Sequence, residues 1–367
     1  MKKFVLGVIA VTAAATTFAT AQPLAQAATP KETKQAAAAE AWLVKQLKDG
    51  LIPSSYGGYN YGPSIDAALS IQAAHGKKAD VTKIATAVEA NGATSYTDAD
   101  YCSNADFSYY SAAPCTDKPA DAHEYVTVAS GGVAKALLLA EVSGVGSKKA
   151  LTTKLEGLVT ADGSIHDSVL VDGVADTSGA NDYASNDGEI YAVAALTRAK
   201  SSKAKLALKY LLSQQCANGA FPFAYNGCST DKPSDSVDAT AFAVWLLHEA
   251  GIDKSGTAKK SLAKAETWLT KRQASNGSFE ANANSTGLAG YALGLVGKTK
   301  QAEKAAAWVA KLQVSAKAGG KLSDAHGALA YDATALTTAK SSGWSAASDQ
   351  WLLVAAQALP VLNYLKK

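Results

Sequence analysis

The sequence predicts an all-α fold, an (α/α)6 toroid of six helical hairpins whose loop-rich rim is stapled by disulfides. Three observations predict it. Hydrophobic residues make up 48% of the chain, alanine dominates them, and alternating β-branched runs are few, so helices are favoured over sheet. A spacing of apolar residue, Gln, Gly and second apolar residue recurs along the chain. Four cysteines fall as two pairs within long loops.

The repeat organises the chain into six units of roughly 40–70 residues. In each full copy Gln follows an apolar residue by four positions, Gly follows Gln by four, and an apolar residue follows Gly by two. In two further copies Val replaces Gln, and in a sixth the Gly is displaced to Gly320. The sets are Trp42/Gln46/Gly50/Ile52, Leu211/Gln215/Gly219/Phe221, Leu269/Gln273/Gly277/Phe279, then Ile84/Val88/Gly92, Leu155/Val159/Gly163/Ile165, and Val309/Gln313.

Each unit predicts two helices of different character. The first is amphipathic, as in 258–273, with apolar residues on one stripe and lysines elsewhere. We expect the following Gly to end it as a left-handed C-terminal cap. The second, such as 239–251, is apolar almost all round and is therefore expected to be buried on all sides. Six such pairs favour a closed toroid, and an open solenoid is the alternative. The tail 347–365 supplies the sixth inner helix if 326–340 is irregular.

The N-terminal segment predicts export. Basic residues precede an apolar run over 4–19, and Ala25-Gln26-Ala27 is a small-x-small cleavage site. We therefore expect a secretory signal at 1–27, a short linker at 28–36 and one toroid domain at 37–367, with a membrane anchor as the alternative. Without Lys2 and Lys3 the formal charge falls from +3 to +1. We expect a secreted monomer that has no membrane span after signal removal and no nucleic-acid partner.

The cysteines predict two disulfides. An even count in an exported chain favours a disulfide framework, and four cysteines allow three connectivities. We expect Cys102–Cys115 and Cys216–Cys228, because each pair brackets one loop. A zinc site is the alternative, but the spacings lack metal-type pairs.

The long connections carry most of the acidic and aromatic residues. They span 92–124, 161–187 and 219–235, and all belong at one end of a toroid, where they predict a ligand-binding rim. The alternative is that loops of exported proteins are simply rich in Asp, Gly and Tyr. The candidate ligand-binding residues are Asp121, His123, Tyr125, Tyr183, Phe223, Tyr225 and Trp245.

Two acidic pairs stand where inner helices are expected to begin. Asp235 and Asp238 precede the fourth such helix, and Asp121 and Glu124 hold the matching places in the second unit. Capping explains one acid of each pair, because carboxylates favour the positive end of a helix by about 0.5–1 kcal/mol. A role facing a ligand or ion is the other interpretation, and both stay open.

The Gln-x3-Gly-x-aromatic spacing resembles the QW-type repeats of the terpenoid cyclase and protein prenyltransferase superfamily, over residues 35–340. The resemblance implies a toroid but not an activity. Class II cyclases carry Asp-x-Asp-Asp-Thr-Ala; here only Asp238, the implied proton donor, matches within 236–241. The prenyltransferase zinc set and the thioester Cys-Gly-Glu-Gln run have no counterpart. The related cobalamin carriers have a small C-terminal β-domain, whereas this chain ends in a predicted helix.

These observations predict a secreted, non-catalytic binding protein for a small apolar or aromatic ligand or a cell-surface partner. The alternative is an enzyme, either terpenoid cyclase-like through Asp238 or a glycan hydrolase or lyase that uses two carboxylates. The candidate catalytic residues are Asp238, Asp235, Glu124 and Glu189. No cofactor is required. Calcium is an alternative at Asp98 with Asp100, or at Asn186 with Asp187 and Glu189.

Overall fold

The computed structural model describes residues 30–91, 96–104, 106, 108–116, 118–228, 235–254 and 256–366. The expected signal segment 1–27 and Gly92 lie outside them. The described part is mostly helical. One set of helices has nearly continuous burial: α2 (Tyr61–Ala73), α4 (Ser130–Ser143), α6 (Asn186–Arg198), α8 (Val237–Glu249), α10 (Ala283–Leu295) and α13 (Ser348–Ala358). We call these the ring helices.

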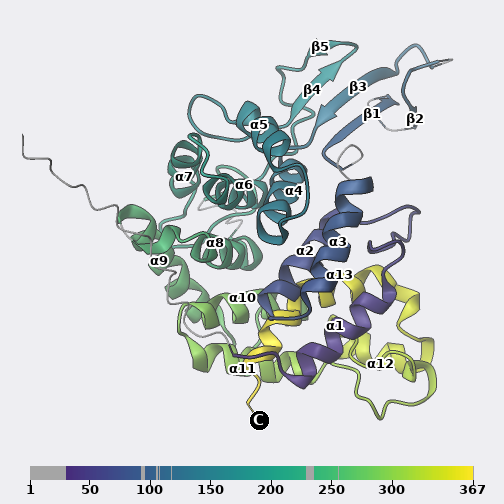
Figure 1. Cartoon of the computed structure of the whole chain (residues 1–367), viewed down its shortest axis with the longest axis vertical. Helices are drawn as coiled ribbons and strands as arrows, with labels where there is room; N and C mark the ends of the chain where they lie inside the picture. Colours follow the sequence, from purple (N-terminus) through teal and green to yellow (C-terminus); the bar gives the residue numbers. More distant parts are fainter. Residues whose placement is uncertain are drawn as a thin grey trace, which may run out of the picture.

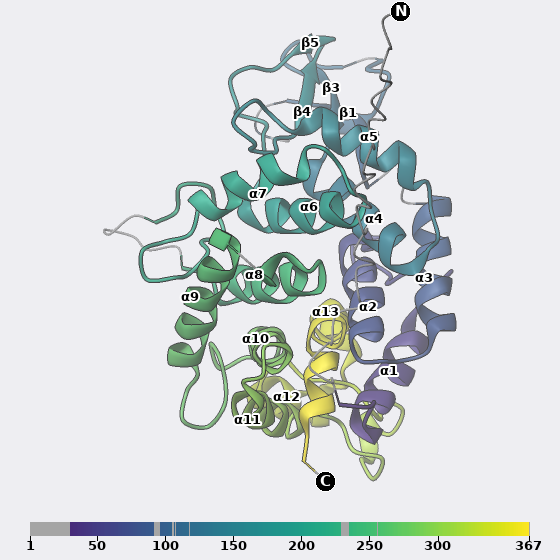
Figure 2. The same cartoon turned by 60° about the vertical axis from the view of Figure 1, so that its left-hand side comes forward.

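The ring helices follow one another in a cycle of direct contacts. Helix α2 packs on α4, α4 on α6, α6 on α8, α8 on α10, α10 on α13, and α13 returns to α2. In Figure 1, α4 and α6 lie in the upper half of the molecule and α10 and α13 in the lower half, and the turned view in Figure 2 shows α13 between α10 and α2. Every residue of α10 is buried, as expected for a helix surrounded by protein.

A second set of helices flanks the ring on its outside, as the turned view in Figure 2 shows. These flanking helices bury one stripe and expose the rest. In α9 the buried residues include Leu262, Ala265 and Leu269, and the lysines lie on the open side. This is the predicted amphipathic pattern. The flanking helices are α1 (Lys34–Gln46), α3 (Lys78–Asn91), α5 (Lys148–Leu158), α7 (Ala204–Ser213), α9 (Gly256–Arg272) and α11 (Thr299–Ala310).

The C-terminal region differs from a regular sixth pair. Helix α12 (Ala333–Ser342) buries only Ala339, whereas α13 joins the ring. The chain then continues into a 3-10 helix, η4 (Leu359–Tyr364), which packs on α1 and α11. Helix α1 begins at Lys34, inside the segment expected as a linker. The Thr33 N–H donates to Asn363 Oδ1 at 3.0 Å, and this bond ties the two ends of the domain together. Shorter 3-10 turns are η1 (Ile252–Lys254), η2 (Gly320–Leu322) and η3 (Ser345–Ala347).

The repeat glycines that the structure describes do not cap helices, so for these positions the expectation is wrong. Helix α7 ends at Ser213, and Gly219 lies in the turn beyond it with φ +101°. A Cβ on Gly219 would come within 2.7 Å of the Lys264 carbonyl oxygen in α9. Gly163 and Gly277 approach the next flanking helix in the same way. The glycine therefore allows each turn to lie against the backbone of the following unit.

Three of the four repeat glutamines stabilise the same contact, whereas Gln46 Nε2 donates to the Trp42 carbonyl of its own helix. Gln215 Nε2 donates to the Gly219 carbonyl and to the Ser261 carbonyl of α9, both at 2.9 Å. Gln273 repeats this between its own turn and the Gln301 carbonyl of α11. Gln313 does so with Gly327 and with the Gln35 carbonyl of α1. The sixth glycine is therefore Gly327, not Gly320. The hydrogen bond from Gln313 to the Gln35 carbonyl joins the last helical unit to the first.

The all-α expectation is wrong in one region. Five antiparallel strands in the order β2-β1-β3-β4-β5 form a small sheet beside α4 and α5, at the top of Figure 1. The register places Tyr101 opposite Tyr125 and Val126 opposite Leu170. The β-branched and aromatic residues in "HEYVTV" and "SVLV" favour strands at these positions. The strands are β1 (Asp98–Ser103), β2 (Tyr110–Ala112), β3 (His123–Val128), β4 (Ser168–Val171) and β5 (Val174–Ala175).

Both expected disulfides are confirmed. Cys102 and Cys115 join the sheet region at a Cα–Cα distance of 5.6 Å. Cys216 and Cys228 close the loop after α7 at 5.2 Å. No helix in the described residues has the length and apolarity needed to cross a membrane.

Candidate functional site

A pocket of about 340 Å³ opens among the ring helices. We call it the central pocket. Its walls come from helices α2, α4, α6, α8 and α13 and from the segments that precede α4 and α6. It is lined by Asp66, Tyr96, Ala129, Gly131, Gly132, Lys135, Asp167, Tyr183, Ala184, Ser185, Asp187, Gly188, Tyr191, Phe242 and Gln357. Small residues at the starts of α4 and α6 let these helices approach closely: a Cβ on Gly188 would lie 3.3 Å from the Gly131 Cα.

A buried ion pair crosses the central pocket from α4 to α2. Lys135 Nζ lies 2.8 Å from Asp66 Oδ1 and 4.6 Å from the centroid of the Tyr191 ring. The Tyr191 hydroxyl donates to Asp66 Oδ1 at 3.0 Å, and Gln357 Nε2 donates to Asp66 Oδ2 at 3.4 Å. Burial lowers the pKa of Lys135, but the Asp66 carboxylate outweighs it and the pKa lies above its ordinary value. Lys135 is therefore charged at neutral pH.

Asp187 lies in the first turn of α6 and also lines the central pocket. Its Oδ1 is buried and has no hydrogen-bond partner among the described residues. Burial raises the pKa of Asp187 to about 6; Lys135 lowers it, and the charges of Asp238 and Asp66 raise it. A buried acceptor without a donor is rare in native proteins, and it marks a place where a ligand can bind.

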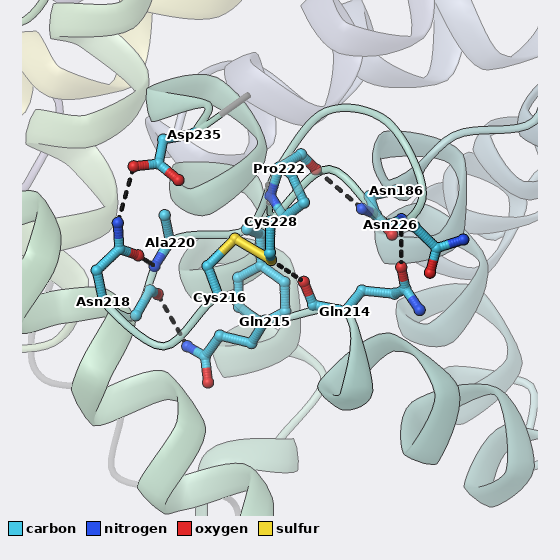
Figure 3. Close-up of a disulfide and its surroundings, with 12 residues drawn as sticks. Asn186, Gln214, Gln215, Cys216, Asn218, Ala220, Pro222, Asn226, Cys228 and Asp235 are labelled. Carbon is cyan, nitrogen blue, oxygen red and sulfur yellow. Dashed lines mark hydrogen bonds between the residues drawn. A yellow bond between two sulfur atoms is a disulfide. The ribbon is translucent and has the colours of Figure 1, made fainter. Parts of the chain in front are cut away.

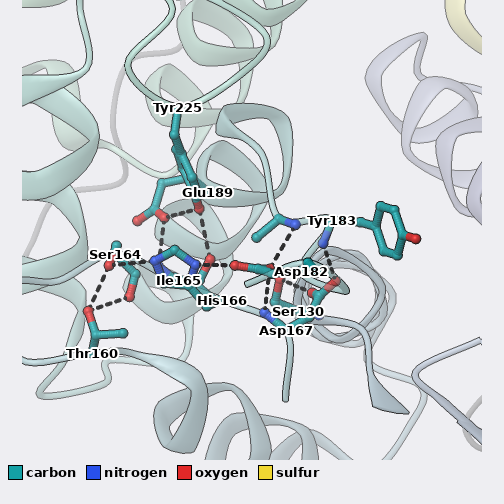
Figure 4. A network of polar contacts seen from close by, with 12 residues as sticks. Ser130, Thr160, Ser164, Ile165, His166, Asp167, Asp182, Tyr183, Glu189 and Tyr225 are labelled. Carbon is teal, nitrogen blue, oxygen red and sulfur yellow. Dashed lines mark hydrogen bonds and ion pairs between the residues drawn. The ribbon is translucent and has the colours of Figure 1, made fainter. Parts of the chain in front are cut away.

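A second layer of polar contacts supports the wall of the pocket, as Figure 4 shows. Asp167 Oδ1 accepts from the backbone and hydroxyl groups of Ser130, both at 2.7 Å, and so caps α4. Asp167 Oδ2 accepts from the Tyr183 N–H at 3.2 Å. Asp182 in turn accepts from the Asp167 N–H and contacts His166 Nδ1. This network holds the exposed Tyr183 ring at the pocket.

Ser164, His166 and Asp182 have the order of contacts found in serine hydrolases. His166 Nε2 lies 3.0 Å from Ser164 Oγ, and its Nδ1 contacts Asp182 Oδ2. However, Ser164 is only 3% exposed, and its Oγ also lies 2.8 Å from Asp162 Oδ1. A substrate carbonyl cannot approach this hydroxyl. The arrangement stabilises the loop and does not form a nucleophile.

The predicted acids Asp235 and Asp238 do not line the central pocket. Asp238 lies in the first turn of α8, its Oδ1 has no partner among the described residues, and burial raises its pKa. Asp235 Oδ2 accepts from Asn218 Nδ2 at 2.8 Å, as Figure 3 shows. Ser236, not either acid, provides the N-cap by accepting from the Ala239 N–H. Neither acid is therefore the N-cap of α8, although Asp238 lies in its first turn, where a carboxylate favours the positive end of the helix.

The second predicted acidic pair lies on and beside the sheet and not at a helix start. Glu124 belongs to β3, and α4 begins six residues later at Ser130. His123 Nδ1 lies 2.6 Å from Asp172 Oδ2, and the Glu124 N–H donates to the other Asp172 oxygen. Asp121 accepts from Asn104, and the Tyr125 ring stacks on Tyr101 at 5.1 Å. These four predicted residues form a cluster apart from Asp235 and Asp238.

The loop closed by Cys216 and Cys228 brings Tyr225 into contact with Glu189 of α6, and both are predicted site residues. Tyr225 has its hydroxyl 2.9 Å from Glu189 Oε2 and 2.8 Å from the Ile165 carbonyl (Figure 4). Burial raises the pKa of Glu189 to about 8, so this carboxyl group is largely protonated at neutral pH. Phe223 lies on the same loop with 56% of its surface exposed.

Trp245 lies in the core and not at the rim. It is 3% exposed, and its Nε1 donates to Glu249 Oε1 at 2.9 Å. The calcium alternatives have other partners: Asp98 binds Lys154 at 2.6 Å, and Asn186 Nδ2 donates to the Pro222 and Ala224 carbonyls. Among the residues described, no group of three or more His, Cys, Asp or Glu is placed to hold a metal ion.

Of the predicted ligand-binding residues, only Tyr183 lines the central pocket. Sequence reasoning did not select Asp66, Lys135, Tyr191 or Gln357. A signal for two of them exists. Asp66 is the one charged residue of α2, and Lys135 is one of two in α4, beside Glu141 near the end of that helix. A buried charge requires a partner or a role.

No protein-family model matches this chain, and no curated protein matches it. Among solved structures, the chain is similar to the type II terpene cyclase MstE from Scytonema in its apo form. The sequence identity is 12%, the TM-score is 0.52, and the match covers 89% of this chain and 98% of that one. At this identity the likeness concerns the fold alone. The chain has a helical, terpenoid cyclase-like fold with an added antiparallel sheet.

Proposed function

We propose that this chain is an exported binding protein that holds a small molecule in the central pocket. One observation carries the proposal: a pocket of about 340 Å³ is lined by the Lys135–Asp66 pair and by Asp187, whose buried Oδ1 has no donor among the described residues. Convergent polar groups in a concave site among packed helices are typical of ligand sites. The site thus lies in the ring, and the predicted acidic residues of the outer loops surround it only in part.

We infer that the ring is a closed (α/α)6 toroid. The cycle of contacts from α2 round to α13 and back supports this inference. The hydrogen bond from Gln313 to the Gln35 carbonyl also supports the closed ring, because this bond joins the last unit to the first. In a closed ring the pocket walls are fixed by neighbours on every side, which reduces the entropy lost on binding.

Two features support export. The disulfides Cys102–Cys115 and Cys216–Cys228 are typical of proteins in oxidising compartments. The basic and apolar segment at 1–27 has the composition of a secretory signal. Mass spectrometry of the protein recovered from culture medium tests this point. It should give an N-terminus near Ala28 and no free thiol, and an uncleaved chain confined to cells would contradict export.

A thermal-shift screen of small molecules tests the binding function, with calorimetry to confirm each hit. The Ala184→Trp variant fills the central pocket, because the Ala184 side chain lines it. The matched control is Ala180→Trp, an exposed position of the same loop that does not line the pocket. Hits should lose binding in Ala184→Trp and keep it in Ala180→Trp. Equal binding by both variants would refute the central pocket as the site.

A catalytic role for Asp238 is the second candidate. It is favoured by a specific observation: the carboxyl group is buried at the start of α8, its Oδ1 lacks a partner among the described residues, and its pKa is raised. A buried carboxyl group with a raised pKa in this position is the kind of group that proton-initiated cyclisation needs. Turnover of a polyprenoid that is abolished by Asp238→Asn, with folding unchanged, would establish this candidate over the binding function.

A further inference from the structure

We propose that the ligand of the central pocket is an organic cation, a small molecule with a protonated amine whose nitrogen the Asp187 carboxylate binds. This inference rests on the proposed function and adds the chemical class of the ligand. Its first support is charge. The lining contains three carboxylates and one ammonium group, so its formal charge is −2 when all of them are ionised: Asp66, Asp167, Asp187 and Lys135.

The second support is the hydrogen-bond inventory of these carboxylates. Asp66 accepts from Lys135, Tyr191 and Gln357. Asp167 accepts from two groups of Ser130 and from the Tyr183 N–H. Of the three carboxylates that line the pocket, only Asp187 has a buried oxygen without a donor among the described residues. The missing donor is therefore an N–H or O–H group that a ligand can bring, and a charged N–H donor gives the stronger bond.

Helix ends do not reverse this preference. The positive N-termini of α4 and α6 would attract anions. At α4 the Asp167 carboxylate already accepts from the N–H and the hydroxyl of Ser130, the first residue of the helix, and at α6 Asp187 itself lies in the first turn. Both ends are thus compensated by protein carboxylates, and an anionic ligand would meet their negative charge.

The aromatic lining adds a second attraction for an amine. Lys135 Nζ lies over the Tyr191 ring at 4.6 Å, so one ammonium group is already stabilised by a ring face in this pocket. Tyr183, which is 71% exposed, and Phe242 offer further aromatic surface. A volume of about 340 Å³ fits an organic molecule rather than a bare ion, and no metal-holding cluster occurs in the described residues.

The charged groups around Asp187 set the pH dependence. Lys135 of α4 favours the carboxylate, whereas Asp66 of α2 and Asp238 of α8 oppose it. The pKa of Asp187 is about 6, so the group is mostly ionised above that pH. An amine that is protonated throughout should therefore bind more weakly as the pH falls below about 6.

Calorimetry with three matched probes tests the inference: benzylamine, benzyl alcohol and benzoate, at about pH 7.5 and about pH 5. At the higher pH benzylamine should bind at least about tenfold more tightly than benzyl alcohol, and benzoate should bind more weakly than either. Asp187→Asn should reduce benzylamine affinity by about tenfold and leave benzyl alcohol unchanged. Asp235→Asn, a carboxylate outside the pocket, is the control and should change neither.

Some outcomes overturn this inference without touching the proposed function. Equal affinity for amine and alcohol, no effect of Asp187→Asn, or tighter binding at the lower pH would each refute the cation while binding in the pocket stands. Absence of binding by all three probes would refute it as well. Failure of the proposed function has a different signature, namely that a probe binds Ala184→Trp as tightly as the unmodified protein.

Discussion

Replacing Gly219 by Ala should destabilise the protein by disturbing the contact between consecutive units. The new Cβ would lie 2.7 Å from the Lys264 carbonyl oxygen and 2.9 Å from the Lys264 carbonyl carbon, both of which belong to the α9 backbone. Relieving such a clash by moving a packed helix costs about 1–3 kcal/mol. The φ of +101° adds about 1–2 kcal/mol for an L-residue. Alanine offsets about 0.4–1 kcal/mol of this loss, because it reduces the conformational entropy of the unfolded chain. We expect a net loss of about 2–4 kcal/mol.

Gly173→Ala is the matched control. Gly173 also has a positive φ, of +80°, but a Cβ there meets nothing within 4 Å. Its cost should be about 1 kcal/mol, because only the backbone conformation opposes it. Urea unfolding followed by far-ultraviolet circular dichroism, with the disulfides intact, measures both variants. If Gly219→Ala cost no more than Gly173→Ala, the close approach of the turn to α9 would not contribute to stability and our account of the repeat would be refuted.

Three further predictions concern other parts of the molecule. Glu189→Gln should flatten the pH dependence of stability, because the pKa of Glu189 is about 8 in the folded protein and 4.5 ordinarily. The contribution of Glu189 to the free energy of unfolding is full below about pH 4.5 and is lost, at up to about 1.4 kcal/mol per pH unit, as the pH rises to 8. Urea unfolding across that pH range measures the difference. Replacing Cys216 and Cys228 by Ser should lower the free energy of unfolding by about 3 kcal/mol through the released loop, and a reductant should then have no further effect at this loop. Trp245→Phe should cost about 1–3 kcal/mol, because the buried Glu249 loses a donor, yet leave ligand affinity within about twofold; a large affinity loss would return Trp245 to the site.

The repeat and the disulfides could be predicted from the sequence because both are local. An apolar stripe, a Gln and a Gly at fixed spacing describe one turn and its neighbour, and Cys216 and Cys228 bracket a single loop. The spacing could not show what the glycine does. Its role depends on the backbone of the next flanking helix, some 45 residues further on for Gly219 and Lys264. In the sixth unit a longer turn moves that role to Gly327.

The sheet and the pocket could not be predicted in the same way. Strand β3 pairs with β4 across helices α4 and α5, and short strands of that kind are decided by distant partners rather than by composition. The pocket gathers side chains from five helices, and no spacing within one segment reports their meeting. The sequence did contain one signal, namely that Asp66 is the one charged residue of α2 and Lys135 is one of two in α4. The acid-rich loops instead led to the prediction of a site at the rim, although Asp121 and Glu124 lie on or beside the sheet.

The Lys135–Asp66 pair explains why Asp187 remains free to bind a ligand. A buried ion pair gives little net stability, since desolvation offsets most of its attraction. Asp66, however, joins four ring helices through Lys135 of α4, Tyr191 of α6 and Gln357 of α13. With its ammonium group directed to Asp66, Lys135 lowers the pKa of Asp187 from a distance but is not its hydrogen-bond donor in the described structure. The pair therefore fixes the walls of the pocket and leaves one carboxylate oxygen for a donor from outside the chain.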